Sequence, residues 1–206
     1  YKGNEIKMTS YTIEDLCHCI VTGATNSVYE KADAADAQHF LLTGSCLNQQ
    51  GQIEADQLTP ICVKDEKSIA RFSLQTGDVV LLARGSTIRA AYVDETTAQL
   101  GVLASANFLL LRPKKELLLG ETLVAFLNSQ LGIAMLERMN TGAVIQNISA
   151  SSLKKTEIPL PSLHDQQRLA ELFHARNLAY MDTLALAEQQ KKAADACIEQ
   201  LLKGDA

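Results

Sequence analysis

The feature that most constrains this chain is a long stretch without proline or glycine near its C-terminal end, from Ser162 to Lys203. At about 1.5 Å of rise per residue it forms a helix of roughly 60 Å, which is rare in a globular domain of this size. Ser162 and Asp165 have the spacing of a capping box, with Asp in the place of Glu or Gln. Pro159-Leu160-Pro161 directly precedes them. We therefore expect a domain over residues 1–161, followed by a helix over residues 162–206.

Apolar residues recur along this helix at alternating steps of mostly four and three, which is the seam of a coiled coil. Asn177 and Lys191 interrupt the seam, and polar residues at such positions fix register and pairing at a cost in stability. We expect the helix to pair with a second helix. The alternative is an amphipathic helix that packs on its own domain. The expected pairing residues are Leu169, Phe173, Tyr180, Leu184, Ala187, Ala194, Ile198 and Leu201.

Residues 1–161 carry short apolar runs separated by turn residues, which predicts a globular mixed domain and, with the long helix, the α+β class. Gly77-Asp78 leads into Val79–Ala83, an apolar run typical of a fully buried strand. Residues 151–153 and 158–161 are expected to be extended, because residues before proline avoid the helical region. Further strands are expected over 39–43, 90–93 and 108–113, helices over 11–16 (with Thr12 near its N-cap) and 121–139 (stopped by Gly142), and turns over 21–27 and 48–52.

Charge is unevenly distributed along the chain. The net charge of −5 argues mildly against a nucleic-acid partner, because phosphate contacts need Lys and Arg. Residues 67–115, however, contain seven basic and three acidic residues. A basic segment therefore lies inside an acidic chain.

The five cysteines have no paired spacing and do not form a disulfide framework, which favours a reducing, cytoplasmic compartment. Cys17-His18-Cys19 lacks the second ligand pair that a structural zinc site needs. The sequence has neither a signal peptide pattern nor an apolar run long enough for a membrane span. We expect no metal, no membrane association and buried thiols on a helix or strand.

The motifs of common enzyme classes are missing from the sequence. It has no phosphate-binding loop ending in Gly-Lys-Ser/Thr, no Gly-x-Ser-x-Gly elbow and no dinucleotide fingerprint after a strand. The four histidines do not pair at ligand spacing. We therefore expect no catalytic residue and no cofactor.

Three polar segments are candidates for recognition. In the first, Arg84, Gly85, Ser86, Thr87 and Arg89 follow the buried strand. Arginine can fork onto phosphate or onto guanine, and Gly85 allows a ligand to approach the backbone closely. The second segment contains Thr141, Gln146 and Asn147, whose types bind phosphates and, for Asn and Gln, adenine edges. The third contains Asn48 and Gln49. The alternatives are a surface turn, a helix-capping loop and a hairpin turn.

Four segments, in this order, resemble the specificity subunits of type I restriction–modification enzymes. Leu74–Ser86 looks like the family's stretch of Gly-Asp, apolar strand and Arg/Ser-Gly-Ser/Thr, and Phe126–Gln130 is similar to its Tyr-Leu-x-Ser helix. Thr141–Ser149 is similar to its Gly-Ser…Ile-x loop. Ile158–Ala170 is similar to its Ile-Pro-x-Pro-Pro-x-x-Glu-Gln-x-x-Ile-Ala segment, with Asp165 where Glu is usual. Each segment alone is weak evidence for the family, but four such segments in the same order make the resemblance fairly specific.

The resemblance implies a target-recognition domain over residues 1–161 and a helical spacer over residues 162–206. Full members of the family carry two of each: the two domains read the two halves of a split DNA site, and the paired helices set the gap between them. This chain carries one of each, so it is expected to be either a fragment or a half-subunit that forms a homodimer through its long helix. The implied partners are double-stranded DNA and methyltransferase subunits, with the restriction subunit as a further candidate.

The function favoured by the sequence is specific DNA binding that directs a type I DNA methylation and restriction complex to its target, without catalysis by this chain. The alternative is a protein–protein adaptor of the same fold that does not read DNA. A small hydrolase is a third class, and the missing motifs argue against it.

Overall fold

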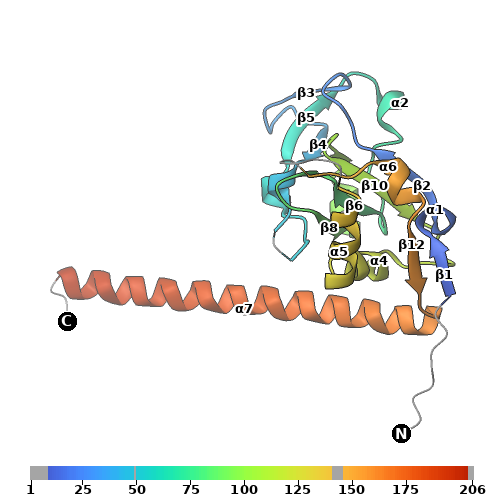
Figure 1. Ribbon diagram of the computed structural model, residues 1–206. Helices are drawn as coiled ribbons and strands as arrows, with labels where there is room; N and C mark the ends of the chain where they lie inside the picture. The colour runs from blue at the N-terminus through green and yellow to red at the C-terminus, as the bar shows by residue number, and fades with distance from the viewer. Residues whose placement is uncertain (1–8, 49, 141–145, 204–206) are drawn as a thin grey trace, which may run out of the picture. The chain divides into compact units, whose positions relative to one another are not determined.

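The computed structural model describes residues 9–48, 50–140 and 146–203 (Figure 1). The chain forms two compact units, Tyr1–Leu169 and Ala170–Ala206. The first contains β-sheets with short helices around them, and the second is the distal part of one long helix, α7 (Leu163–Lys203). The predicted α+β class with a long C-terminal helix is confirmed.

The first sheet lies at the centre of the first unit and is entirely antiparallel. Its strand order is β2-β10-β6-β8. Both faces of β6 are buried, which explains why its sequence is a continuous apolar run instead of an alternating pattern. The bounds are β2 (Cys17–Thr22), β10 (Phe108–Pro113), β6 (Val79–Leu82) and β8 (Arg89–Tyr92).

The second sheet has the order β3-β5-β4-β9, in which only the β4–β9 pair is parallel among the described strands. Its two faces belong to different cores. Leu42 and Ala104 join a cluster with Val80 and Phe108 of the first sheet, so this core lies between the sheets. Leu41, Ile61 and Leu103 join a cluster with Ile69 and Phe72 on the other face. The bounds are β3 (Tyr29–Lys31), β5 (Thr59–Val63), β4 (His39–Leu42) and β9 (Val102–Ala104).

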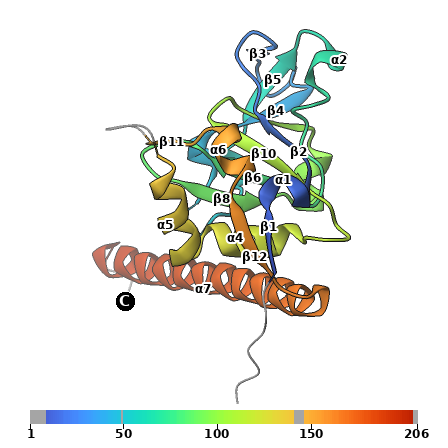
Figure 2. The same cartoon turned by 45° about the vertical axis from the view of Figure 1, so that its right-hand side comes forward.

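Short elements complete the first unit. The pairs β1–β12 and β7–β11 form separate two-stranded ladders, and α1 and α6 lie against β2 (Figure 2). These elements are β1 (Thr9–Thr12), β12 (Glu157–Leu160), β7 (Arg84–Gly85), β11 (Gln146–Asn147), α1 (Ile13–Leu16), α2 (Glu66–Ile69), α3 (Glu95–Gln99), α4 (Gly120–Leu127), α5 (Gln130–Arg138), α6 (Ala150–Lys154), and the 3-10 turns Gly44–Cys46 and Ala55–Gln57.

The prediction of one helix over residues 121–139 is wrong, because the chain forms α4 and α5 there. Ser129 separates them: its hydroxyl accepts the N–H of Gly132 at 3.1 Å and donates to the carbonyl of Phe126 at 2.6 Å. Gly132 allows the close approach, since a Cβ there would lie 2.1 Å from that same carbonyl oxygen. The apolar period continues across the break, which is why the sequence pattern conceals it.

The prediction of extended chain is wrong for residues 151–153 and confirmed for residues 158–160, which lie in β12. Residues 150–154 form α6, because the Ser149 hydroxyl accepts the N–H of Ser152 and caps the helix. The turn expected over residues 21–27 begins later than expected, since β2 extends to Thr22. The cap predicted at Thr12 is confirmed by its bond from the N–H of Asp15 at 3.2 Å.

A buried ion pair joins the loop before β6 to the central strand β10. The side chain of Asp78 is almost fully buried and accepts from Nε and Nη2 of Arg112 at 2.8 and 2.9 Å. Arg112 also donates to the carbonyl of Ser73, and Asp78 accepts the N–H of Gln75. The hydrogen bond to Asp78 raises the pKa of Arg112. Because all these groups have partners, the pair fixes the entry into β6.

The start of α7 is fastened to the first unit by Gln166, which is 0% exposed. Its Oε1 accepts the N–H of Leu119 at 2.9 Å, and its Nε2 donates to the carbonyls of Leu117 and Pro161 at 2.9 and 3.0 Å. The predicted cap at Ser162 is confirmed by the N–H of Asp165, which donates to its hydroxyl at 3.2 Å. Three backbone groups therefore depend on one buried amide.

The second unit is the helical part of α7 from Ala170 onward, and many of its apolar side chains are exposed. Among the residues expected to pair, Leu184, Ile198 and Leu201 are 47, 54 and 69% exposed, Tyr180 is half-buried and Phe173 is buried. Within the part of the chain that the structure describes, no helix is both long and apolar enough to cross a membrane.

Replacing Gln166 with glutamate tests the buried amide. Gln166→Glu keeps the acceptor for Leu119 but loses both donated bonds and places a carboxyl group against two carbonyl oxygens. We expect the free energy of unfolding at pH 7.5 to fall by about 3 kcal/mol, measured by urea denaturation. The loss should be smaller at pH 5, because a carboxyl whose folded pKa lies above its unfolded value of about 4.3 destabilises increasingly as pH rises.

The matched control is Gln167→Glu, the same change on the exposed neighbour. Its free energy of unfolding should stay within about 0.5 kcal/mol of the unchanged protein. Equal losses for the two variants would contradict the role assigned to Gln166.

Candidate nucleic-acid interface

Backbone pairing brings two of the three predicted polar segments together. Gln146 and Asn147 of β11 pair with Gly85 and Arg84 of β7. The N–H of Ile148 continues the contact by donating to the carbonyl of Ala83 at 3.0 Å. The sequence predicted these as two separate recognition segments, about sixty residues apart. In the structure they form one site.

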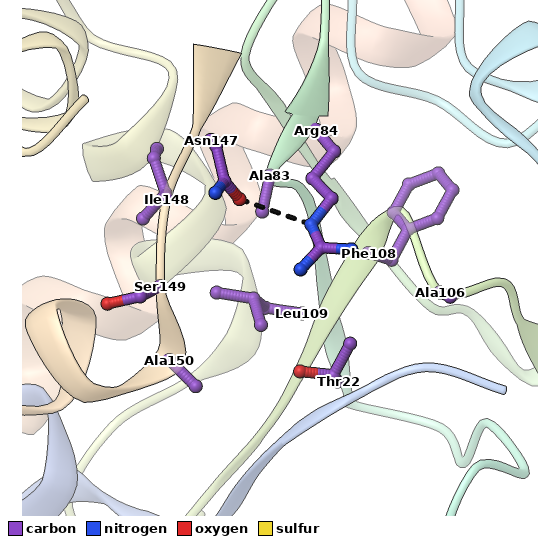
Figure 3. Close-up of a pocket in the computed structure, with 10 residues that line it drawn as sticks. All are labelled: Thr22, Ala83, Arg84, Ala106, Phe108, Leu109, Asn147, Ile148, Ser149 and Ala150. Atoms are coloured by element: carbon purple, nitrogen blue, oxygen red, sulfur yellow. Dashed lines mark hydrogen bonds between the residues drawn. The ribbon is translucent and has the colours of Figure 1, made fainter. Parts of the chain in front are cut away.

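A side-chain bond links the same two segments. Nε of Arg84 donates to Oδ1 of Asn147 at 3.1 Å, between residues 63 positions apart (Figure 3). The backbones of both residues are anchored elsewhere. The N–H of Arg84 donates to the carbonyl of Asn107 at 3.1 Å, and the N–H of Asn147 donates to Oδ1 of Asn140 at 3.0 Å. The position of this pair is therefore set by the turn before β10 and by the end of α5.

A recess of about 170 Å³ lies beside this pair (Figure 3). Its floor includes the buried Phe108 and Leu109. Its volume lies below the roughly 300–1,000 Å³ of typical small-molecule sites. Polar side chains surround it, and we call Thr22, Arg84, Asn147 and Ser149 the rim. The other lining residues are Ala83, Ala106, Ile148 and Ala150.

The rest of the first segment is accessible. Arg84, Ser86 and Thr87 are exposed. A Cβ added to Gly85 would come no closer than 3.9 Å to Leu82, so packing within the chain leaves space at this position. The close approach of a ligand to Gly85 stays a prediction.

Arg89 and Asn48 lie beside each other, and each has a hydrogen-bond partner within the chain. Nη1 of Arg89 donates to the carbonyl of Asn48 at 3.2 Å. Oδ1 of Asn48 accepts the N–H groups of Gln50 and Gln52 at 3.0 and 2.9 Å, which makes it the organiser of its own turn. A DNA contact by either residue stays a prediction, and the hydrogen bonds give both a structural role.

Asn128, at the end of α4, bonds to β8 next to this turn. Its amide accepts the N–H of Ala90 and donates to the carbonyl of Ala90, both at 2.8 Å. Gly51 has a φ of 74°, and a Cβ there would lie 2.4 Å from the same carbonyl oxygen. The residue type at Gly51 is thus required by close packing, which the turn pattern alone did not reveal.

Two predicted site residues, Gln49 and Thr141, lie outside the described residues. Gln146 is described through its backbone pairing with Gly85. The sequence reasoning missed Thr22 and Ser149 on the rim, and Asn140 and Asn107 behind it. Ser149 lies at the end of a segment that was singled out, but nothing in the local sequence marks Thr22, which reaches the rim through the pairing of β2 with β10.

The Cys17-His18-Cys19 triplet lies on β2. Across residues 9–48, 50–140 and 146–203, no three His, Cys, Asp or Glu side chains are grouped so that they could hold a metal ion. Burial, and next the neighbouring Cys19, raise the pKa of the Cys17 thiol from 9.0 to about 12. Cys17 is therefore an inert thiol of the interior.

Alkylation rates test the state of Cys17. At pH 8 the smaller thiolate fraction outweighs the greater nucleophilicity of a high-pKa thiolate, so Cys17 should react at least about 50-fold more slowly than the exposed Cys197. Peptide mass spectrometry after timed alkylation measures both rates. Unfolding in guanidinium should make the two rates similar, and similar rates in the folded protein would refute the prediction.

The profile of the type I restriction modification DNA specificity domain matches residues 5–193. The chain belongs to this family. The matched region includes the rim residues and most of α7, so the resemblance of the four sequence segments is confirmed.

Solved structures of similar fold are specificity subunits. The type I restriction-modification S subunit from M. genitalium is 20% identical, with a TM-score of 0.58 over 93% of this chain and 45% of that one. The HsdS subunit from Thermoanaerobacter tengcongensis is 18% identical, with a TM-score of 0.58 over 93% and 47%. A chain from a structure on complex assembly and conformational transition of the type I R-M system is 18% identical, with a TM-score of 0.59 over 98% and 48%.

This specificity domain therefore spans a little under half the length of the solved chains that it resembles. No curated protein matches the sequence. At these identities the solved structures establish the fold of the chain.

Proposed function

We propose that this chain is the non-catalytic component that recognises a DNA sequence for a type I methyltransferase and restriction complex in the cytoplasm. The observation that carries the proposal is the rim. Arg84 and Asn147 come from segments 63 residues apart and are joined by a hydrogen bond at an accessible edge of a rigid sheet domain. Recognition residues on loops held by such a scaffold are a common arrangement for binding.

The chemistry of the rim suits base edges and phosphates. Arg84 supplies a charged fork, Asn147 an amide, and Thr22 and Ser149 hydroxyl groups. Arginine and amide side chains read guanine and adenine edges, and hydroxyls bind phosphate oxygens.

The proposed organisation is a target-recognition domain over residues 1–161 and a spacer and dimerisation helix over residues 162–206. The proposed partners are double-stranded DNA, methyltransferase subunits and the restriction subunit. Because the chain spans about half of the similar subunits, two copies would supply two recognition domains. We propose that they pair through α7.

The residues at the seam favour antiparallel pairing of the two copies. In a parallel pair in register, Lys191 would face Lys191 of the other copy inside the seam, which costs stability. An antiparallel register centred between residues 185 and 186 instead opposes Leu184 to Ala187, Tyr180 to Lys191 and Asn177 to Ala194. Leu184 then faces a small side chain, and the ammonium group of Lys191 can reach solvent past the Tyr180 ring.

A protein–protein adaptor of the same fold is the second candidate, and the net charge of −5 favours it. An adaptor would keep a partner-binding helix without sequence-dependent affinity for DNA. The two candidates differ in one measurable quantity, the ratio of specific to non-specific DNA affinity.

Selection from randomised duplexes, followed by titration in increasing salt, measures that ratio for the full chain. We expect an enriched motif, bound at least about 10³-fold more tightly than a scrambled duplex, with log K falling linearly with log salt concentration. Arg84→Ala should weaken binding to the motif by about 1–3 kcal/mol. Arg71→Ala, at an exposed arginine that stacks on Phe72, is the control and should bind as the unchanged chain does. Enrichment of no motif would favour the adaptor.

Substitutions on opposite faces of α7 test the pairing of two copies. Leu184→Glu places carboxylates at the centre of the seam and should raise the dimer dissociation constant at least about 100-fold, because the symmetry repeats each change. Leu178→Glu is the matched control, since Leu178 is exposed but lies one position after the seam residue Asn177. Analytical ultracentrifugation measures both. A monomeric unchanged chain at tens of micromolar, or equal effects of the two variants, would contradict the proposal.

A further inference from the structure

The orientation of the Arg84 guanidinium is determined by Asn147. An arginine Nε–H can only donate, so the atom of Asn147 that it meets must be the acceptor Oδ1, at 3.1 Å. The two residues also face each other in the β7–β11 ladder. The bond therefore links side chains whose backbones already have fixed positions.

This bond uses Nε, on the side edge of the guanidinium, and leaves the two terminal nitrogens available for another acceptor. An arginine can present either Nε with one terminal nitrogen, or both terminal nitrogens as a parallel pair. Because Nε is used, Arg84 presents Nη1 and Nη2. Figure 3 shows these nitrogens beyond the bond to Asn147, on the side of the guanidinium toward the recess and Thr22.

No carboxylate of the residues that the structure describes neutralises the charge of Arg84. Among the ion pairs of the described residues none involves Arg84, and the recess is lined by no Asp or Glu. Arg112, in contrast, has its fork filled by Asp78. The guanidinium of Arg84 is therefore oriented by a hydrogen bond, but its charge has no ion-pair partner among the described residues. Such an exposed arginine is available to bind an acceptor outside the chain.

We propose that Arg84 reads a guanine in the major groove through its two terminal nitrogens, and that Asn147 is the positioning residue that sets the plane of the fork. This inference rests on the proposed function. Guanine presents O6 and N7 side by side in the plane of the base, so both the direction and the plane of the fork matter. A phosphate can also accept the fork as a bidentate pair, but its oxygens surround the phosphorus and do not impose a single plane on the guanidinium. The held geometry therefore favours a guanine over a phosphate.

Base preference, rather than affinity, separates these two contacts. The full chain and its variants are each used to select duplexes from a randomised library. The unchanged chain should enrich a motif with at least one invariant guanine. Arg84→Lys keeps the charge but loses the planar fork, so the preference at that guanine should fall by about 5- to 150-fold while the rest of the motif is retained.

Two substitutions at Asn147 test positioning. Asn147→Ala removes the acceptor for Nε. It should weaken the preference for guanine at the same position of the motif and leave the preferences at the other positions unchanged. Asn147→Asp keeps an acceptor for Nε and should restore the guanine preference, although its charge lowers affinity for DNA. Arg71→Lys is the matched control for Arg84→Lys and should leave every position unchanged.

Replacing the assigned guanine with 7-deazaguanine removes the N7 acceptor without altering base pairing. Binding by the unchanged chain should weaken by about 10-fold, and binding by the Arg84→Lys variant should change much less. A motif that Arg84→Lys leaves unaltered would assign Arg84 to a phosphate and overturn this inference, while DNA recognition by the chain would stand. Enrichment of no motif by the unchanged chain would overturn the proposed function and this inference with it.

Discussion

The two-residue ladder between β7 and β11 is the contact on which the candidate site depends. Four backbone positions hold together segments that are far apart in the chain, and so short a ladder has little stability of its own. Its position is imposed from outside. The carbonyl of Asn107 holds one side, Oδ1 of Asn140 holds the other, and Ala83 bonds to Ile148 just beyond the ladder. The geometry of the rim is thus determined by the folded domain.

Buried polar groups give that domain its definite geometry. Asp78 with Arg112 fixes the entry into β6, and Gln166 fixes the start of α7 against residues 117–119. An apolar core is compatible with many packings of similar energy, whereas a buried amide or carboxylate is satisfied in few. The same principle extends to the rim, where Asn147 fixes the direction of a neighbouring arginine.

Local sequence signals predicted the elements whose cause is local. The apolar run of β6, the caps at Thr12 and Ser162 and the length of α7 all follow from neighbouring residues. The sequence did not predict the break between α4 and α5, because the apolar period continues across Ser129, where one helix ends and the next begins. The meeting of Arg84 with Asn147 and Thr22 could not be read from the sequence, because strand pairing across the fold produces it. Asn48 has an amide group that could read a base edge, but its Oδ1 accepts hydrogen bonds within its own turn.

A chain with a net negative charge can still recognise DNA if its acidic residues lie away from the residues that contact the DNA. Residues 67–115, which contain Arg84, hold seven basic and three acidic residues, whereas the two ends of the chain are acidic. Non-specific attraction to phosphates is then weak, so discrimination rests on directed hydrogen bonds at the rim. Two such domains related by a two-fold axis would present the same rim to both strands, and a split site read in this way has to be close to palindromic. In the proposed dimer, the two-fold symmetry and the modest charge of each domain lead to one expectation: neither copy binds firmly alone, and specificity comes from engaging both half-sites together.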